Sequence, residues 1–205
     1  MNHTAPRLRT AVRLAAPAVA ALTLTMAFAG PASANPAFVS RSGGQVNFSA
    51  LPGEQNTVTF TLDANETSFL VGDSTSTLVA GPGCTQLNPN VVSCGPAAGV
   101  TRIRASLGDG DDFVSNTTSI PSDLLGGTGD DRLFGGEGPD RISDPDGSNS
   151  VHLLQTIDGR GGNDTIISRN GRFDTIQCGP GFDVLLADRV GVDTVLGGCE
   201  FVQRF

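Results

Sequence analysis

Glycine and aspartate recur at fixed spacing between Gly126 and Ser143, where the chain reads GGTGDDRLF and then GGEGPDRIS. Both nine-residue segments fit the pattern G-G-x-G-x-D-x-U-x, in which U is a large apolar residue. Glycine permits positive φ angles and close approach of two backbones, so such a segment can turn and leave carbonyl oxygens exposed. The Asp adds a carboxylate, and oxygen-only ligation is what Ca²⁺ prefers. The pattern therefore predicts a cation bound at the turns and an apolar core behind them.

Less regular copies of this pattern extend over the C-terminal half of the chain. A flexible Gly/Asp linker has no reason to place an aliphatic residue two positions after each Asp. Antiparallel hairpins with Asp-Gly turns do not explain the nine-residue tandem. We therefore expect turns that alternate with very short strands. The Asp/aliphatic pairs are Asp112/Val114, Asp131/Leu133, Asp140/Ile142, Asp164/Ile166, Asp174/Ile176, Asp183/Leu185 and Asp193/Val195.

The spacing of the aspartates indicates which of them stack. Two nine-residue units form one coil, so equivalent turns recur after about 18 residues. Asp140 has no clear partner at this spacing, and segment 144–156 interrupts the register, which predicts a bulge or loop there. We expect the aliphatic side chains to stack inside and the Asp side chains to stack outside, along the turns. The expected stacked pairs, whose common spacing is close to that of one coil, are Asp112 with Asp131, Asp164 with Asp183, and Asp174 with Asp193.

A column of aspartates repels itself unless a cation neutralises it. Two unit charges 4 Å apart in a partly desolvated site interact by about 4 kcal/mol at an effective dielectric constant near 20. A divalent cation between coils turns this repulsion into attraction. Cation binding and folding are therefore expected to be coupled.

The tandem at Gly126–Ser143 resembles the RTX, or haemolysin-type, calcium-binding repeat family, and the resemblance covers Leu107 to about Val195. The closing pattern from Cys178 to Glu200 is similar to small exported calcium-binding proteins of Gram-positive bacteria. The resemblance implies a parallel β-roll that holds Ca²⁺ between coils. The best-known members also carry an effector domain, which we do not find here, so toxin or protease activity is not implied. The implied metal positions are Asp112, Asp131, Asp140, Asp164, Asp183, Asp174 and Asp193, together with Gly110, Gly127, Gly129, Gly136, Gly138, Gly162 and Gly181.

The N-terminal segment is typical of a secretory signal peptide. Three arginines precede an apolar run from Leu14 to Phe28, and Ala32-Ser33-Ala34 fits a signal peptidase site. We predict that residues 1–34 are a signal peptide cleaved after Ala34 and that the mature protein is secreted. No second apolar run follows, so insertion into a membrane is not expected.

The charge of the expected mature chain excludes some partners. It contains 10 Arg, no Lys and 21 acidic residues, which gives a net charge of −11. This acidity argues against nucleic acid and anionic membranes and favours cations. Asp outnumbers Glu by 17 to 4, whereas a merely solvated acidic surface does not require Asp in preference to Glu.

Residues 35–106 contain less Asp and more Val, Thr, Ser and Phe than the repeats. The sequence shows no helical period after the signal peptide. This region is therefore either a separate β unit that caps the repeats or their first rungs. The predicted fold is all-β, a parallel β-roll or β-helix solenoid over 107–205 with an N-terminal β region over 35–106. Alternation and β-propensity predict strands at Gln45–Phe48, Thr57–Leu62, Ser68–Val71, Val91–Ser93 and Thr101–Leu107.

Four cysteines in an exported chain indicate disulfides. Pairing of nearest neighbours gives Cys84–Cys94 and Cys178–Cys199, and the second bond would tie down the C-terminal end. A zinc site is the rival interpretation. It does not fit the spacing, because the chain has no C-x-x-C motif.

No catalytic motif is found. His152 is the only histidine after the signal peptide, and the chain lacks G-x-S-x-G, H-E-x-x-H and P-loop patterns. We therefore expect no enzymatic activity. The principal hypothesis is a secreted, monomeric calcium-binding protein that folds or rigidifies with Ca²⁺. The alternative is a structural or adhesive extracellular solenoid with little Ca²⁺ dependence, whose protein or glycan partner the sequence does not identify.

Overall fold

A computed structural model describes Met1, residues 36–145 and residues 155–205. The predicted signal peptide, its cleavage site and His152 lie outside the described residues.

The described part of the chain consists of strands and turns, as predicted, and its only helical element is a 3₁₀ turn, η1 (Ala97–Gly99). The strands are β1 (Ala37–Ser42), β2 (Gln45–Ser49), β3 (Thr57–Leu62), β4 (Ser68–Asp73), β5 (Leu78–Ala80), β6 (Thr85–Asn88), β7 (Val91–Pro96), β8 (Arg102–Asp109), β9 (Phe113–Asn116), β10 (Ser122–Thr128), β11 (Arg132–Phe134), β12 (Arg141–Ser143), β13 (Gln155–Asp158), β14 (Thr165–Ile167), β15 (Asp174–Gln177), β16 (Val184–Ala187), β17 (Thr194–Gly197) and β18 (Phe201–Arg204).

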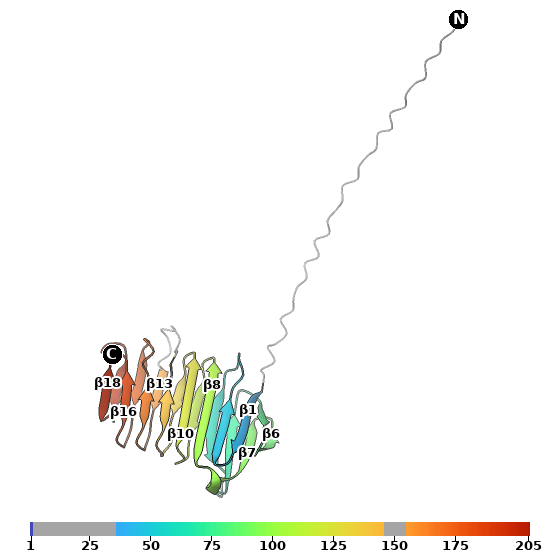
Figure 1. The fold of residues 1–205 in the computed structure, drawn as a ribbon, viewed down its shortest axis with the longest axis horizontal. Helices are drawn as coiled ribbons and strands as arrows, with labels where there is room; N and C mark the ends of the chain where they lie inside the picture. Colours follow the sequence, from blue (N-terminus) through green and yellow to red (C-terminus); the bar gives the residue numbers. More distant parts are fainter. Residues whose placement is uncertain (2–35, 146–154) are drawn as a thin grey trace. The chain divides into compact units, whose positions relative to one another are not determined.

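These strands form two mixed sheets of nine strands each. Sheet A has the order β18-β16-β14-β12-β10-β8-β2-β1-β5, and sheet B has the order β17-β15-β13-β11-β9-β3-β4-β7-β6. From β8 onward the chain alternates between the sheets, and from β10 onward each strand pairs in parallel with the strand two positions earlier. Figure 1 shows the result, with β8, β10, β16 and β18 following one another in this order along the molecule and further strands between β10 and β16.

The N-terminal region contains strands of two kinds. β2 and β3 pair in parallel with β8 and β9, in the manner of the later strands. β1 pairs antiparallel with β2, and β4 pairs antiparallel with β3 and β7. All five predicted strands of this region are present. The sequence missed β1, β5 and β6, of which β5 is three residues long and β6 is exposed throughout, so neither shows an alternating burial pattern.

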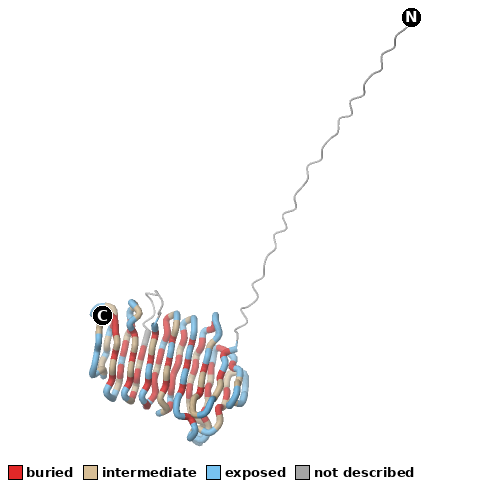
Figure 2. The backbone as a smooth tube through the Cα atoms, in the orientation of Figure 1, coloured by how far each residue is buried: buried red, intermediate tan, exposed pale blue. Residues whose placement is uncertain are grey.

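A single aliphatic side chain per strand builds the core of the repeats. In sheet B the buried column contains Val114, Leu133, Ile157 and Ile176. In sheet A the equivalent column runs through Leu124, Ile142, Ile166 and Leu185. Figure 2 shows buried segments that recur on successive strands. The prediction that the aliphatic residue after each Asp points inward is therefore confirmed, with Val195 near the C-terminal end only partly buried.

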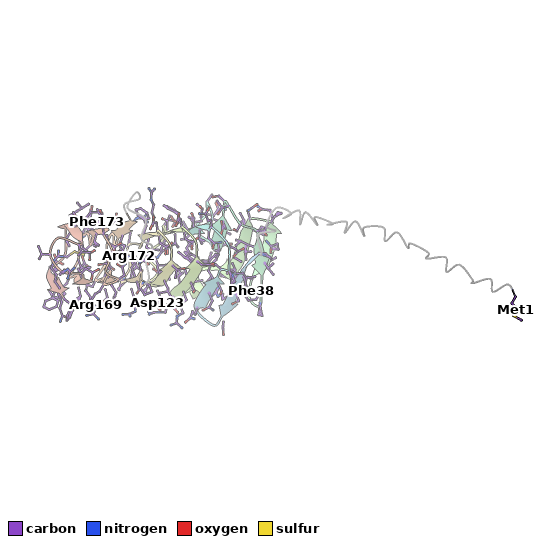
Figure 3. The ribbon with its side chains drawn as sticks, turned by 90° about the horizontal axis from the view of Figure 1, so that it is seen from above. Met1, Phe38, Asp123, Arg169, Arg172 and Phe173 are labelled. Carbon is purple, nitrogen blue, oxygen red and sulfur yellow. A yellow bond between two sulfur atoms is a disulfide. The ribbon has the colours of Figure 1, made fainter. Side chains whose placement is uncertain are left out.

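The two sheets present their outer faces on opposite sides of this core. Phe38 and Asp123 of sheet A lie along one long side, and Phe173, which precedes β15 of sheet B, lies along the other (Figure 3). Asp123 accepts hydrogen bonds from Arg102 Nε at 2.9 Å and Nη2 at 2.8 Å. The outer faces thus carry charged pairs such as Arg102 with Asp123 and exposed apolar side chains such as Phe38, while aliphatic side chains fill the space between the sheets.

The register of the parallel strands shows that the coils differ in length. Phe113 lies opposite Arg132, and Asp123 lies opposite Arg141, so both of these coils are close to two nonapeptides long. The next coil is longer, because Arg132 lies opposite Thr156. The predicted interruption within 144–156 is therefore confirmed as a longer coil; residues 146–154 of it are outside the described part.

Both predicted disulfides are present, Cys84–Cys94 and Cys178–Cys199. Disulfides form and persist in oxidising compartments such as the cell exterior. None of the described residues belongs to a helix with the length and apolar character needed to span a bilayer.

Candidate metal centre

The repeat aspartates lie in two rows of stacked turns. The residues of the first row lie directly before, or at the start of, strands of sheet B, and those of the second row lie at the same places in sheet A. Each row begins with an uncharged residue, Asn56 or Ser122. The first row contains Asn56, Asp112, Asp131, Asp174 and Asp193; the second contains Ser122, Asp140, Asp164, Asp183 and Glu200.

A continuous ladder of hydrogen bonds connects the second row. Each backbone N–H donates to the side chain of the residue one coil further on. The distances are 2.7 Å from Ser122 N to Asp140 Oδ1 and 2.8 Å from Asp140 N to Asp164 Oδ1. The ladder continues with 2.7 Å from Asp164 N to Asp183 Oδ1 and 2.8 Å from Asp183 N to Glu200 Oε2. Successive coils are therefore joined through their acidic side chains.

The first row repeats this arrangement. Asn56 N donates to Asp112 Oδ1 at 2.7 Å, and Asp112 N donates to Asp131 Oδ1 at 2.9 Å. Further along, Asp174 N donates to Asp193 Oδ1 at 3.1 Å.

All three predicted stacked pairs are confirmed by these bonds. The statement that Asp140 has no partner is wrong. Asp140 stacks on Asp164 across the coil of 24 residues, and the spacing rule missed the pair because the longer coil shifts the register.

The expectation that the Asp side chains stack on the outside is also wrong. All seven predicted aspartates are buried, with exposed fractions between 0% and 6%. Their carboxylates are held beneath the neighbouring coil because that coil's backbone N–H donates to them. Water therefore cannot solvate these charges as it would on a surface.

Five of the seven carboxylates have one oxygen that accepts no hydrogen bond from the described residues, although it is buried. Burial of a charged oxygen without a partner costs free energy unless a cation or a proton compensates it. Asp140 and Asp193 differ, because both of their oxygens accept hydrogen bonds. The unpartnered atoms are Asp112 Oδ2, Asp131 Oδ2, Asp164 Oδ2, Asp174 Oδ1 and Asp183 Oδ2.

Burial raises the pKa of these carboxyl groups. It raises the pKa of Asp112 to about 7, with a further contribution from the charge of Asp131. It raises the pKa of Asp174 to about 8, with contributions from Asp193 and Asp144. The pKa of Asp164 is raised to about 7 and that of Asp131 to about 6, again mainly by burial. Metal-free carboxylates at these positions are thus disfavoured in their charged form.

The predicted glycines allow the turns to stack closely. A side chain at Gly127 would meet the carbonyl oxygen of Gly108, and one at Gly129 would meet that of Gly110. Both positions also have positive φ angles, 118° and 132°. The other five predicted glycines, Gly110, Gly136, Gly138, Gly162 and Gly181, likewise face a backbone carbonyl of an adjacent coil. The glycines therefore bring the carbonyl oxygens of successive turns together beside the aspartates.

Arg160 contacts the turns of neighbouring coils, and this role was not predicted from the sequence. Its Nη1 donates to the carbonyl oxygens of Asn116 at 2.7 Å and Gly135 at 3.0 Å, and its Nη2 donates to Ser115 Oγ at 3.0 Å. Its guanidinium also lies 5.5 Å from the ring centroid of Phe134. Arg160 occupies the second position of a nonapeptide, where the repeat has Gly. The presence of Arg in place of the repeat Gly was the sequence feature from which a side chain that bridges three coils could have been predicted.

The donor set constrains any metal that binds here. Within the described ranges, no three His, Cys, Asp or Glu side chains are grouped closely enough to hold a metal by themselves. A cation would therefore need backbone carbonyl oxygens in addition to one or two carboxylates, which is compatible with the six to eight oxygen ligands of Ca²⁺. The unpartnered carboxylate oxygens and the stacked carbonyls fit such a cation.

No family model, curated protein or solved structure matches the chain, so these comparisons do not assign it to a family.

Proposed function

We propose that this protein is a secreted calcium-binding protein whose repeats form a parallel β-roll with Ca²⁺ held between stacked turns. The observation that supports this most directly is the set of five buried aspartates, each with one carboxylate oxygen that lacks a partner. A divalent cation would neutralise these charges and join adjacent coils.

The chemistry of the turns favours Ca²⁺ over other metals. All candidate ligands are oxygens, and the described residues provide no free thiol, because the four cysteines form disulfides. Oxygen ligands select hard cations. Mg²⁺ demands a near-ideal octahedron and gives up water reluctantly, whereas Ca²⁺ accepts irregular sites built from carboxylates and carbonyls.

Three groups of turns would hold the cation. In the first row they are the turns of Asp112 and Asp131 and, further along, the turn of Asp174; in the second row they are the turns of Asp164 and Asp183. The carbonyl oxygens that face Gly127 and Gly129 are candidate ligands in the first group. When bound, Ca²⁺ would supply positive charge that replaces the missing hydrogen bonds, so that binding favours the folded state.

The parallel pairing, with most coils close to two nonapeptides long, supports the β-roll, and so does the tandem at Gly126–Ser143, which resembles RTX repeats. The antiparallel strands β4, β6 and β7 would close one end of the roll, as the open end of a repeat protein requires. Secretion is supported by the signal-like N-terminus and by the two disulfides.

Circular dichroism tests this proposal. The mature chain, residues 35–205, is titrated with Ca²⁺ from a chelated start, with Mg²⁺ as the control. We expect a cooperative gain of β signal with Ca²⁺ alone. A β-rich spectrum that does not change would instead support the alternative, a structural or adhesive solenoid held by its core and disulfides.

Substitutions locate the binding to the repeats. We expect Asp131→Ala to weaken Ca²⁺ affinity at least tenfold, because Asp131 has an unpartnered buried oxygen. Asp140→Ala is expected to weaken it less, since both oxygens of Asp140 accept hydrogen bonds. Asp63→Ala serves as the control, because Asp63 binds Thr67 and Ser68 within its own turn. Calorimetric titration that gives equal effects at all three positions would contradict the repeat assignment.

A further inference from the structure

A turn outside the repeats stacks on the first turn of the repeats. Residues 51–56 read LPGEQN and do not fit the nonapeptide. Nevertheless Gly53 N donates to Asp109 Oδ1 at 2.8 Å, and Asn56 N donates to Asp112 Oδ1 at 2.7 Å. Between them, the carbonyl oxygen of Glu54 lies against Gly110. The offset is 56 residues in each case, so the two turns match residue for residue.

This turn lacks the acidic residue that the repeats have. Asn56 occupies the position of the repeat Asp, directly before a strand of sheet B, and its neutral amide brings no charge. Glu54, two residues earlier, provides a carboxylate instead. Its side chain is turned into the protein, with an exposed fraction of 1%. Its Oε2 accepts a hydrogen bond from Leu51 N at 2.7 Å, much as Asp140 Oδ2 accepts one from Gly136 N in a repeat turn.

Three side-chain oxygens at this junction are buried and accept no hydrogen bond from the described residues. They are Glu54 Oε1, Asn56 Oδ1 and Asp112 Oδ2. No arginine of the described residues forms a salt bridge with Glu54 or Asp112. A fully buried glutamate without a compensating cation is rare in proteins, because almost all buried charges are paired. The unpartnered oxygens therefore point to a ligand.

We propose that Glu54, Asn56 and Asp112 form a Ca²⁺ site that joins the N-terminal region to the first repeat. The site offers two carboxylates, one amide oxygen and neighbouring backbone carbonyls, all of them ligands of Ca²⁺. The choice of cation rests on the proposed function, whereas the site itself rests on Glu54 and Asn56, which lie outside every nonapeptide. Ca²⁺ bound here would hold the turn before β3 against the turn before β9.

Glu54→Gln tests the site with little change in shape. The amide oxygen of Gln can still accept from Leu51 N, while the charge is lost. Glu66→Gln is the matched control, because Glu66 is exposed in the turn between β3 and β4. Each variant of residues 35–205 is dialysed against Ca²⁺ and the bound metal is counted by elemental analysis. We expect Glu54→Gln to bind one Ca²⁺ fewer per chain than the wild type, and Glu66→Gln to bind the same number.

NMR of the wild-type protein provides a test that needs no variant at Glu54. During a Ca²⁺ titration, we expect the amide signals of Leu51, Gly53 and Asn56 to shift. They are expected to shift equally in Asp164→Asn, which removes a carboxylate from the second row. If the wild type binds Ca²⁺ but these amides do not respond, the junction site is overturned while the proposed function stands. If neither the wild type nor Asp164→Asn binds Ca²⁺, the proposed function fails as well.

Discussion

Two buried aspartates, one in each half of the molecule, show how differently the halves are stabilised. Asp73 ends β4 in the N-terminal region and is 2% exposed; Asp174 begins β15 in the repeats and is 0% exposed. The oxygens of Asp73 accept hydrogen bonds from Asn56, Thr57, Thr75 and Ser76. Asp174 accepts one from Asn170 through Oδ2, and its Oδ1 has no partner in the described residues.

The hydrophobic core of the N-terminal region also contains larger side chains than the core of the repeats. The N-terminal region contains a cluster of aromatic rings, in which the centroids of Phe48 and Phe60 lie 6.4 Å apart and those of Phe60 and Phe69 lie 6.3 Å apart. Each strand of the repeats contributes little more than one aliphatic side chain to the core. The N-terminal region thus satisfies the buried charge of Asp73 with its own donors, whereas the repeats leave buried carboxylate oxygens that accept no hydrogen bond from the described residues.

Of the changes considered, removal of Ca²⁺ should have the largest effect on the difference in stability between the two regions. We expect chelation to lower the amide protection of β11 to β17 by about 100-fold, since a ligand at 100 times its Kd stabilises by about 2.7 kcal/mol per site. The amides of β4 and β7 should keep most of their protection. Hydrogen exchange followed by mass spectrometry measures both regions in one experiment. A uniform loss of protection would contradict the division.

Substitution of one aspartate in each region tests whether its contribution to stability depends on Ca²⁺. Asp73→Ala removes several hydrogen bonds to a charged acceptor, and we expect it to lower the free energy of unfolding by about 3 kcal/mol or more. Most of the loss should be independent of Ca²⁺, because the bonds from Thr57, Thr75 and Ser76 involve no proposed metal ligand. Asp164→Ala should lower stability more with Ca²⁺ than with chelator, because without the metal it removes only the hydrogen bond from Asp140 N and a carboxylate oxygen that has no partner in the described residues. Urea unfolding in both conditions provides the measurement.

The pH dependence of the metal-free protein should report the raised pKa values. Burial raises the pKa of Asp112 to about 7 and of Asp174 to about 8. A raised carboxyl pKa leaves the folded state undisturbed below the unfolded pKa and destabilises it as pH rises toward the folded pKa. In chelator, the free energy of unfolding should therefore fall between about pH 4 and pH 8, by about 1.4 kcal/mol per pKa unit at each site as an upper bound. Saturating Ca²⁺ should remove this fall; an identical pH profile in both conditions would refute the role of these carboxylates.

Arg160→Gln should have the smallest effect. The arginine donates to carbonyl oxygens of Asn116 and Gly135, so it already acts as a cation built into the second row. We expect the substitution to cost about 1–2 kcal/mol of stability, in keeping with hydrogen bonds from a partly exposed charged group. The cost should be independent of Ca²⁺, and the number of bound ions should not change. A loss of one Ca²⁺ in dialysis would show that Arg160 supports a metal site instead of replacing one.

The sequence alone determined which residues occupy equivalent positions in successive coils. The repeated offset between Asp131 and Leu133, or between Asp183 and Leu185, encodes a local turn followed by one inward side chain, and the recurrence after two nonapeptides encodes the stacking partner. These features depend on backbone periodicity, which the residues of each nonapeptide specify locally. For this reason the all-β fold, the aliphatic columns and three of the aspartate pairs could be predicted.

The surroundings of each carboxylate, in contrast, follow from contacts between coils and could not be predicted from the sequence. Asp140 and Asp164 are paired across a longer coil, and Glu54 reaches its place because turn 51–56 stacks on a turn 56 residues later. The burial of an aspartate and its hydrogen-bond partners depend on coils that are distant in the chain, and no local pattern records them. The same residue type thus becomes a satisfied structural group at Asp73 and a candidate metal ligand at Asp174, because neighbouring coils supply the donors in one case and leave an oxygen without them in the other.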